Sequence, residues 1–103
     1  MIDTTRSPPP QRAILPLSDT ELATGLSQLR WQLQALVMDG VCLVIVDVSE
    51  VDQISSTALA ALLDTHRVCR RRGGGVVIRH ASRKMSDVLR RTGLDRVFDV
   101  EAA

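Results

Sequence analysis

The chain alternates between short apolar runs and longer segments whose apolar residues recur at helical spacing. Residues 41–48, VCLVIVDV, are almost wholly apolar, which favours a central strand buried on both faces. Shorter apolar runs at 13–17 and 76–79 predict two more strands, and Pro16 suits a strand at the edge of a sheet. Because segments of helix length separate these runs, the pattern predicts an α/β fold with crossover connections.

The first helical segment carries start and stop signals at its ends. Ser18-Asp19-Thr20-Glu21 is a capping-box pattern, and Asp39-Gly40 predicts the helix end, with Gly40 as a left-handed cap. Trp31 lies nearly opposite the apolar stripe, so we expect it either to contact a partner or to cover the N-terminal arm. The stripe consists of Leu22, Leu26, Leu29, Leu33, Leu36 and Val37.

Two further helices are predicted in the second half of the chain. One spans about 56–72 and ends at three consecutive glycines, which lack the Lys-Ser/Thr continuation of a phosphate-binding loop. The other follows Ser82, ends at Gly93 and leaves 94–100 for a helical turn and an edge strand. Helical spacing in the first of these helices places Ala58, Leu62, Thr65, His66 and Cys69 on its buried side. We interpret His66 as a packed, hydrogen-bonded residue rather than a ligand.

Hydroxyl side chains stand where the helix at 56–72 should begin. With Ser55 as the N-cap, Thr57 is the second helical residue, next to unpaired N–H groups and the positive end of the helix dipole. A phosphate on Thr57 would be favoured there, and Ser56 is the fallback acceptor. Helix capping without any regulation is the alternative interpretation of the same residues.

The motif at 47–63, DVSEVDQISSTALAALL, resembles the signature of the STAS domain, the fold of bacterial anti-sigma factor antagonists. Thr57 stands where that family carries its phosphorylatable Ser or Thr, whereas Ser55 replaces the usual Asp and Ala58 the usual Gly. The resemblance continues through 70–77 and 82–98. The positions that match the motif are Asp47, Ser49, Val51, Ile54, Ser56 and Leu59.

The resemblance implies a small mixed β-sheet with helices packed mainly on one side, within a domain spanning 12–103. It also suggests a first helix that starts later, near Ala23, and an additional N-terminal strand. Residues 1–11 contain three consecutive prolines, so we expect a flexible arm there, with either one strand fewer or a short edge pairing by 2–5.

The function that the resemblance implies is binding to an anti-sigma factor, often a serine kinase of the GHKL type, with phosphorylation releasing it. We expect a monomer or weak dimer in the cytoplasm, with no cofactor and no catalysis. The implied partner surface is the loop before the helix at 56–72 and the exposed face of that helix. It comprises Glu50, Asp52, Gln53, Ser55, Ser56, Thr57, Ala60, Leu63, Asp64 and Arg67.

Other functions remain open within the same fold. The domain could be the STAS subunit of a lipid-transport ABC complex, or a scaffold that is never phosphorylated. A response-regulator receiver is disfavoured, since neither 13–17 nor 76–79 ends in the acidic pair or lysine that it needs. Ten of the thirteen basic residues fall between Arg67 and Arg96, but without aromatic residues these cations indicate solvated helix ends rather than a nucleic-acid surface.

The composition of the chain gives further limits on its core, its partners and its compartment. Apolar residues make up 45% and aromatic residues 2% of the 103 residues, so one core of Leu, Val, Ile and Ala is expected. The balance of 13 basic and 12 acidic residues provides no general attraction to nucleic acid. Cys42 and Cys69 lack metal-site spacing and fit a reducing compartment. No apolar run is long enough to span a membrane.

Overall fold

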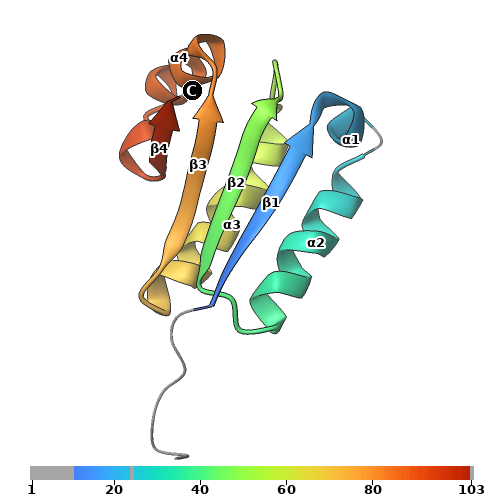
Figure 1. Cartoon of the computed structure of the whole chain (residues 1–103), viewed down its shortest axis with the longest axis vertical. Helices are drawn as coiled ribbons and strands as arrows, with labels where there is room; N and C mark the ends of the chain where they lie inside the picture. The colour runs from blue at the N-terminus through green and yellow to red at the C-terminus, as the bar shows by residue number, and fades with distance from the viewer. Residues whose placement is uncertain (1–10, 24, 103) are drawn as a thin grey trace, which may run out of the picture.

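A computed structural model describes residues 11–23 and 25–102 of the chain (Figure 1). Strands and helices alternate, as the sequence pattern predicts. Their order is β1 (Arg12–Ser18), α1 (Asp19–Ala23), α2 (Leu26–Met38), β2 (Leu43–Glu50), α3 (Ser56–Arg71), β3 (Gly75–Ala81), α4 (Arg83–Arg91), the 3-10 turn η1 (Leu94–Arg96) and β4 (Asp99–Ala102).

The four strands form one sheet in the order β1-β2-β3-β4, and every described pair is parallel. Val44 pairs with Val76, and Ile14 pairs with Ile45. The STAS resemblance implies a mixed sheet and an additional N-terminal strand, and the composition of 1–11 predicts a flexible arm, but residues 1–10 lie outside the described part. In that part the sheet is wholly parallel.

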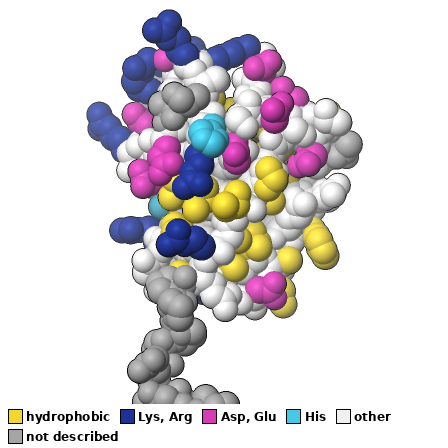
Figure 2. All heavy atoms as spheres, in the orientation of Figure 1, with side chains coloured by type: hydrophobic (Ala, Val, Ile, Leu, Met, Phe, Trp, Pro, Cys, Tyr) yellow, Lys and Arg dark blue, Asp and Glu magenta, His cyan; other side chains and the backbone are white. Residues whose placement is uncertain are grey.

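The core lies between the sheet and the two long helices. Val44, Val46 and Val48 of β2 are 0%, 0% and 1% exposed, because α2 and α3 cover their face of the sheet (Figure 1). On the opposite face Ile45 is buried but Asp47 is only half-buried, so the prediction of burial on both faces holds in part. Figure 2 shows this open face, with hydrophobic side chains flanked by charged ones.

The first helical segment is broken, which corrects the expectation of a single helix. Ser18 Oγ accepts a hydrogen bond from the Glu21 N–H at 3.1 Å, so the predicted cap begins α1. A second helix, α2, then starts at Leu26 after Gly25, whose φ of 127° is accessible to glycine and strained for other residues. The start predicted from the capping box is therefore that of α1, whereas the later start expected near Ala23 falls on the last residue of α1, three residues before α2 begins.

The glycines after α3 allow the chain to pass close to β2. A Cβ atom on Gly74 would lie 1.8 Å from the Cys42 carbonyl oxygen. The next residue, Gly75, donates its N–H to that oxygen at 2.8 Å. Gly74 is thus required for strand docking, a role beyond the helix stop that the sequence predicts.

His66 is a packed, hydrogen-bonded residue, as its position in the sequence predicts. Its Nδ1 accepts the Val76 N–H at 2.9 Å, and its ring meets Phe98 edge-on with centroids 5.4 Å apart. Burial, followed by the positive charge of Arg70, lowers the pKa of His66. The side chain therefore joins α3 to the buried start of β3.

Candidate functional site

The end of β2, just before the β2–α3 loop, is held by the carboxylate of Asp47 in the same strand. Asp47 Oδ1 accepts the Ser49 N–H at 2.9 Å, and the Val51 N–H donates to Val48 O at 3.0 Å. The Ser49 hydrogen bonds, with a smaller contribution from His80, hold the pKa of Asp47 below its ordinary value. Val51 is 2% exposed, so the loop is anchored to the core while its polar residues stay at the surface.

The start of α3 has the geometry that the sequence predicts. Ser55 is the N-cap, with its Oγ accepting the Ala58 N–H at 3.1 Å, and Thr57 is the second helical residue. Ser56 and Thr57 are exposed, whereas Ala58 and Leu59 are buried. The first turn of α3 contains no acidic side chain, so no carboxylate of that turn offsets the positive end of its dipole.

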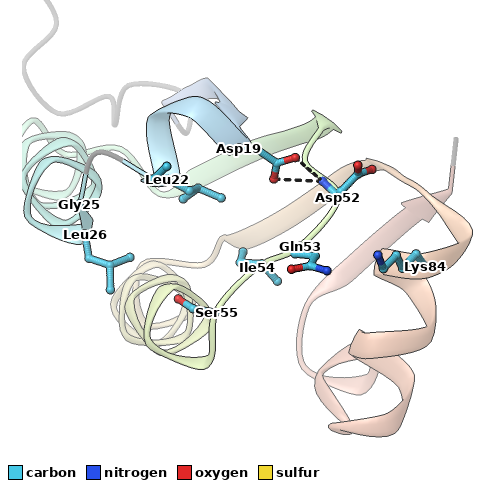
Figure 3. A pocket seen from close by; sticks show the side chains of 10 residues that line it. Asp19, Leu22, Gly25, Leu26, Asp52, Gln53, Ile54, Ser55 and Lys84 are labelled. Atoms are coloured by element: carbon cyan, nitrogen blue, oxygen red, sulfur yellow. Dashed lines mark hydrogen bonds between the residues drawn. The ribbon is translucent and has the colours of Figure 1, made fainter.

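A contact from α1 holds the middle of the loop. Both carboxylate oxygens of Asp19 lie 3.1 Å from the Asp52 nitrogen, which donates its N–H to them (Figure 3). Beside this contact is an open hollow of about 850 Å³, where Lys84 of α4 points toward Gln53 of the loop (Figure 3). The hollow is thus formed by α1, the start of α2, the loop and α4.

Of the ten residues expected to form the partner surface, Glu50 is the last residue of β2, and the others lie on the loop or on one side of α3. Nine are exposed and Leu63 is half-buried. Thr57, Ala60, Asp64 and Arg67 follow one another at spacings of three and four residues, which gives one stripe along the helix. Arg67 and Asp64 form a 4.0 Å ion pair that is largely exposed and contributes little to stability.

His80, Asp19 and Lys84 are the site residues that sequence reasoning missed. His80 has a φ of 61° at the register shift between Arg79 and Ala81, and its Nδ1 lies 3.2 Å from Asp47 Oδ2. The cost of such a backbone is of the order of 1–3 kcal/mol. No local pattern predicts these contacts, because each of the three residues comes from an element distant in the sequence from the loop.

Among the residues that the structure describes, no group of three or more His, Cys, Asp or Glu side chains could hold a metal ion. Over the same residues, no helix is both long and apolar enough to cross a membrane. Cys42 and Cys69 are buried and free. The candidate site is the exposed surface of the β2–α3 loop and α3.

Comparison with known proteins places the fold. The family model described as "Mlab, STAS domain" matches residues 5–100. An NMR structure of the protein TM1081 superposes with a TM-score of 0.74 at 19% identity, covering 89% of this chain and 74% of that one. A crystal structure of TM1081 from Thermotoga maritima, described as a candidate anti-sigma factor antagonist, gives 0.73 at 18% identity, covering 89% and 80%. A comparison with curated proteins gave no match.

The family match covers nearly the whole chain, and the parallel sheet with its loop and α3 agrees with it. The chain belongs to the STAS domain family. The resemblance of the 47–63 motif to the STAS signature is therefore confirmed, as is the α/β fold class.

Proposed function

We propose that this STAS domain is a regulatory binding module of the anti-sigma factor antagonist type, not an enzyme. It binds an anti-sigma factor, most simply a GHKL-type serine kinase, through the β2–α3 loop and the exposed stripe of α3. The observation that carries the proposal is the exposed Thr57 hydroxyl in the first turn of a helix without acidic residues there. Such a role belongs in the cytoplasm.

Phosphorylation of Thr57 is the switch in this proposal. A phosphate carries a charge of about −1.5 to −2 at neutral pH, and the end of a helix dipole with free N–H groups stabilises it. Ser55 already satisfies the Ala58 N–H, so the cap remains after modification. The domain should therefore stay folded, and the effect of the phosphate falls on the interface.

A phosphate on Thr57 would weaken partner binding because of the residues that surround Thr57. A partner packed on Ala60 and Leu63 has to remove water from the new charge, which is costly without a positive counter-charge. Asp52 and Asp64 are exposed acids on the same surface. A partner that presents cations to these acids would also tolerate the phosphate and stay bound. A partner that presents apolar groups would be released.

The test uses the full chain, its co-purified partner identified by mass spectrometry, and ATP. We expect phosphate on Thr57, or on Ser56 as the fallback, weaker binding by Thr57→Glu, and unchanged binding without regulation by Thr57→Ala. Gln28→Glu is the matched control, because it adds the same charge to an exposed position of α2 outside the proposed surface. Circular dichroism of each variant establishes that the fold is intact.

Two outcomes would contradict the switch. If Thr57→Glu binds the partner as tightly as the unmodified chain, charge at this position does not control binding, and a constitutive scaffold is left. If Gln28→Glu weakens binding equally, the effect is one of general charge. If Ala60→Arg abolishes binding and Thr57→Glu has no effect, the proposed binding surface is supported and only the regulation by phosphorylation is refuted.

The second candidate is a STAS subunit of a lipid-transport ABC complex. The observation that favours it is the matching family model, whose description names Mlab. The two candidates differ in the partner: an ATPase with its permease for this one, and a kinase for the first. Co-purification of an ATPase, with no phosphate on Thr57 after incubation with ATP, would favour the lipid-transport role.

A further inference from the structure

A groove of about 290 Å³ lies between α2 and α3. The two helices pack against each other and run in the same direction from the carboxyl ends of the strands (Figure 1). On the α2 side, Arg30, Gln34 and Val37 line the groove, and Arg30 is the first α2 residue to do so. The N-terminal end of this wall therefore carries a cation. Trp31, the next residue, is 70% exposed on the outer face of α2, as its place opposite the apolar stripe predicts.

The α3 wall of the groove continues to Thr57. On this side Ala61, Asp64 and Val68 line the groove. Thr57 precedes Ala61 by four residues and Asp64 by seven, so it lies on the same side of α3, one turn closer to the helix start. Ser56, the fallback acceptor, is about 100° round the helix from Thr57, on the flank away from α2. The two candidate acceptors thus have different neighbours.

Arg30 and Thr57 stand at nearly the same level along their helices. Leu26, at the start of α2, and Ser55, the N-cap of α3, line the same hollow, so the two helices begin close together. At 1.5 Å per residue, Arg30 lies about 6 Å beyond Leu26, and Thr57 about 3 Å beyond Ser55. Packed helices have axes about 8–10 Å apart. The long arginine side chain and a phosphorylated threonine can together span that gap.

A phosphate on Thr57 would be the strongest acceptor within reach of Arg30. Within residues 11–23 and 25–102 Arg30 has no ion pair, and Asp64, the acid that lines the groove, pairs with Arg67 at 4.0 Å. A phosphate carries a charge of about −1.5 to −2, and its oxygens match the planar guanidinium, which can donate two hydrogen bonds to them. Asp64 lies about 10.5 Å from Thr57 along the helix, so salt screens most of its repulsion.

We propose that Arg30 is the internal counter-ion of a phosphate on Thr57, and that a phosphate on Ser56 has no such counter-ion. The inference rests on the proposed function, because it concerns how the Thr57 switch is held. In the phosphorylated chain Arg30 joins α2 to α3 and directs the phosphate toward α2. The N-terminal end of the groove is then closed to a partner. A phosphate on Ser56 meets the same helix dipole without a cation from α2.

The test installs a phosphate on Thr57 or on Ser56 of the full chain during translation, so it needs neither kinase nor partner. Phosphorus NMR between about pH 4.5 and 8 gives the midpoint of the second ionisation of the phosphate, ordinarily near pH 6. A nearby cation favours the dianion and lowers this midpoint. In Arg30→Gln the midpoint should rise by about 0.5 pH units for the phosphate on Thr57 and stay constant for the phosphate on Ser56.

Two further variants separate pairing from general charge. Arg30→Lys keeps the cation and should retain most of the lowered midpoint, although it loses the two-point contact. Arg67→Gln removes an exposed cation ten residues after Thr57 on α3 and should leave the midpoint unchanged. Circular dichroism of each variant establishes that the fold is intact.

Three results would overturn the proposal. They are a constant midpoint for the phosphate on Thr57 in Arg30→Gln, an equal rise for the phosphates on Thr57 and Ser56, and an equal rise in Arg67→Gln. Each is distinct from failure of the proposed function. If the partner and ATP leave no phosphate on Thr57, the switch is refuted and the measured counter-ion stands. If Thr57 is phosphorylated but its midpoint ignores Arg30, the switch stands and the counter-ion is refuted.

Discussion

Replacing His66 tests the link between α3 and the start of β3. In His66→Ala the N–H of Val76, a residue 1% exposed, loses its acceptor, which costs about 1–3 kcal/mol when no water replaces it. The edge-on contact with Phe98 adds about 0.5–1.5 kcal/mol. We therefore expect the free energy of unfolding to fall by roughly 2–4 kcal/mol. In His66→Asn the Oδ1 atom can take the place of Nδ1, so the loss should be smaller.

The same residue makes stability depend on pH. Burial and Arg70 lower the pKa of His66 in the folded chain from the ordinary value of 6.5, so below that pH the unfolded chain binds more protons. The contribution of His66 is therefore fully present above pH 6.5 and is lost as the pH falls through that value toward the lower folded pKa. Protonation turns Nδ1 into a donor facing the Val76 N–H. His66 lines a surface hollow together with Arg70 and Asp99, and Asp99 of β4 is the acid in that hollow.

Urea unfolding followed by circular dichroism between pH 7.5 and 5 measures this effect. The experiment is best done in a His80→Gln background, which leaves His66 as the one histidine. We expect the midpoint of the parent to fall with pH and that of the additional His66→Asn variant to fall much less. Identical pH profiles would refute the assignment, and a loss below about 0.5 kcal/mol in His66→Ala would show that water replaces the acceptor.

Two further substitutions test the core and the strand docking. Leu62→Ala, at a residue 0% exposed, should lower the free energy of unfolding by about 2–5 kcal/mol, and an unchanged melting midpoint would mean that the helix phase is wrong. Gly74→Ala should cost about 1–3 kcal/mol, since the added Cβ would meet the Cys42 carbonyl oxygen. Wild-type stability of Gly74→Ala in urea would contradict the close approach.

Features set by neighbouring residues were predictable from the sequence. The N-caps at Ser55 and Ser82 accept the Ala58 and Met85 N–H groups, both at 3.1 Å, because a Ser just before a helix can accept the N–H three residues later. Gly40 has a φ of 89°, as expected of a left-handed cap. The apolar runs at 13–17 and 76–79 lie within β1 and β3, whereas the run at 41–48 begins two residues before β2 and ends two residues before β2 does.

Features set by tertiary contact were not predictable in the same way. The capping box and the apolar stripe are both real, but the stripe follows the capping box without a gap, so the pattern alone did not place the break before α2, where Gly25 has a φ of 127°. Residue type signals the positive φ of His80 only weakly, because histidine is enriched at positive φ with asparagine and aspartate, yet only a few per cent of non-glycine residues adopt it. This conformation occurs at the register shift between β3 and β4, and His80 there contacts Asp47, 33 residues earlier.

The contact between Asp19 and Asp52 is the clearest example of a tertiary contact that the sequence did not predict. Two acids are normally expected to repel, yet here one carboxylate accepts the backbone N–H of the other residue, and the charge of the Asp52 side chain is not involved. If this bond positions the loop, Asp19→Ala should raise amide exchange at Asp52 by up to about 10-fold, corresponding to about 1.4 kcal/mol, with little change in global stability. Thr20→Ala, an exposed change on the same helix, is the control. Unchanged exchange at Asp52 in Asp19→Ala would mean that the buried Val51 alone holds the loop.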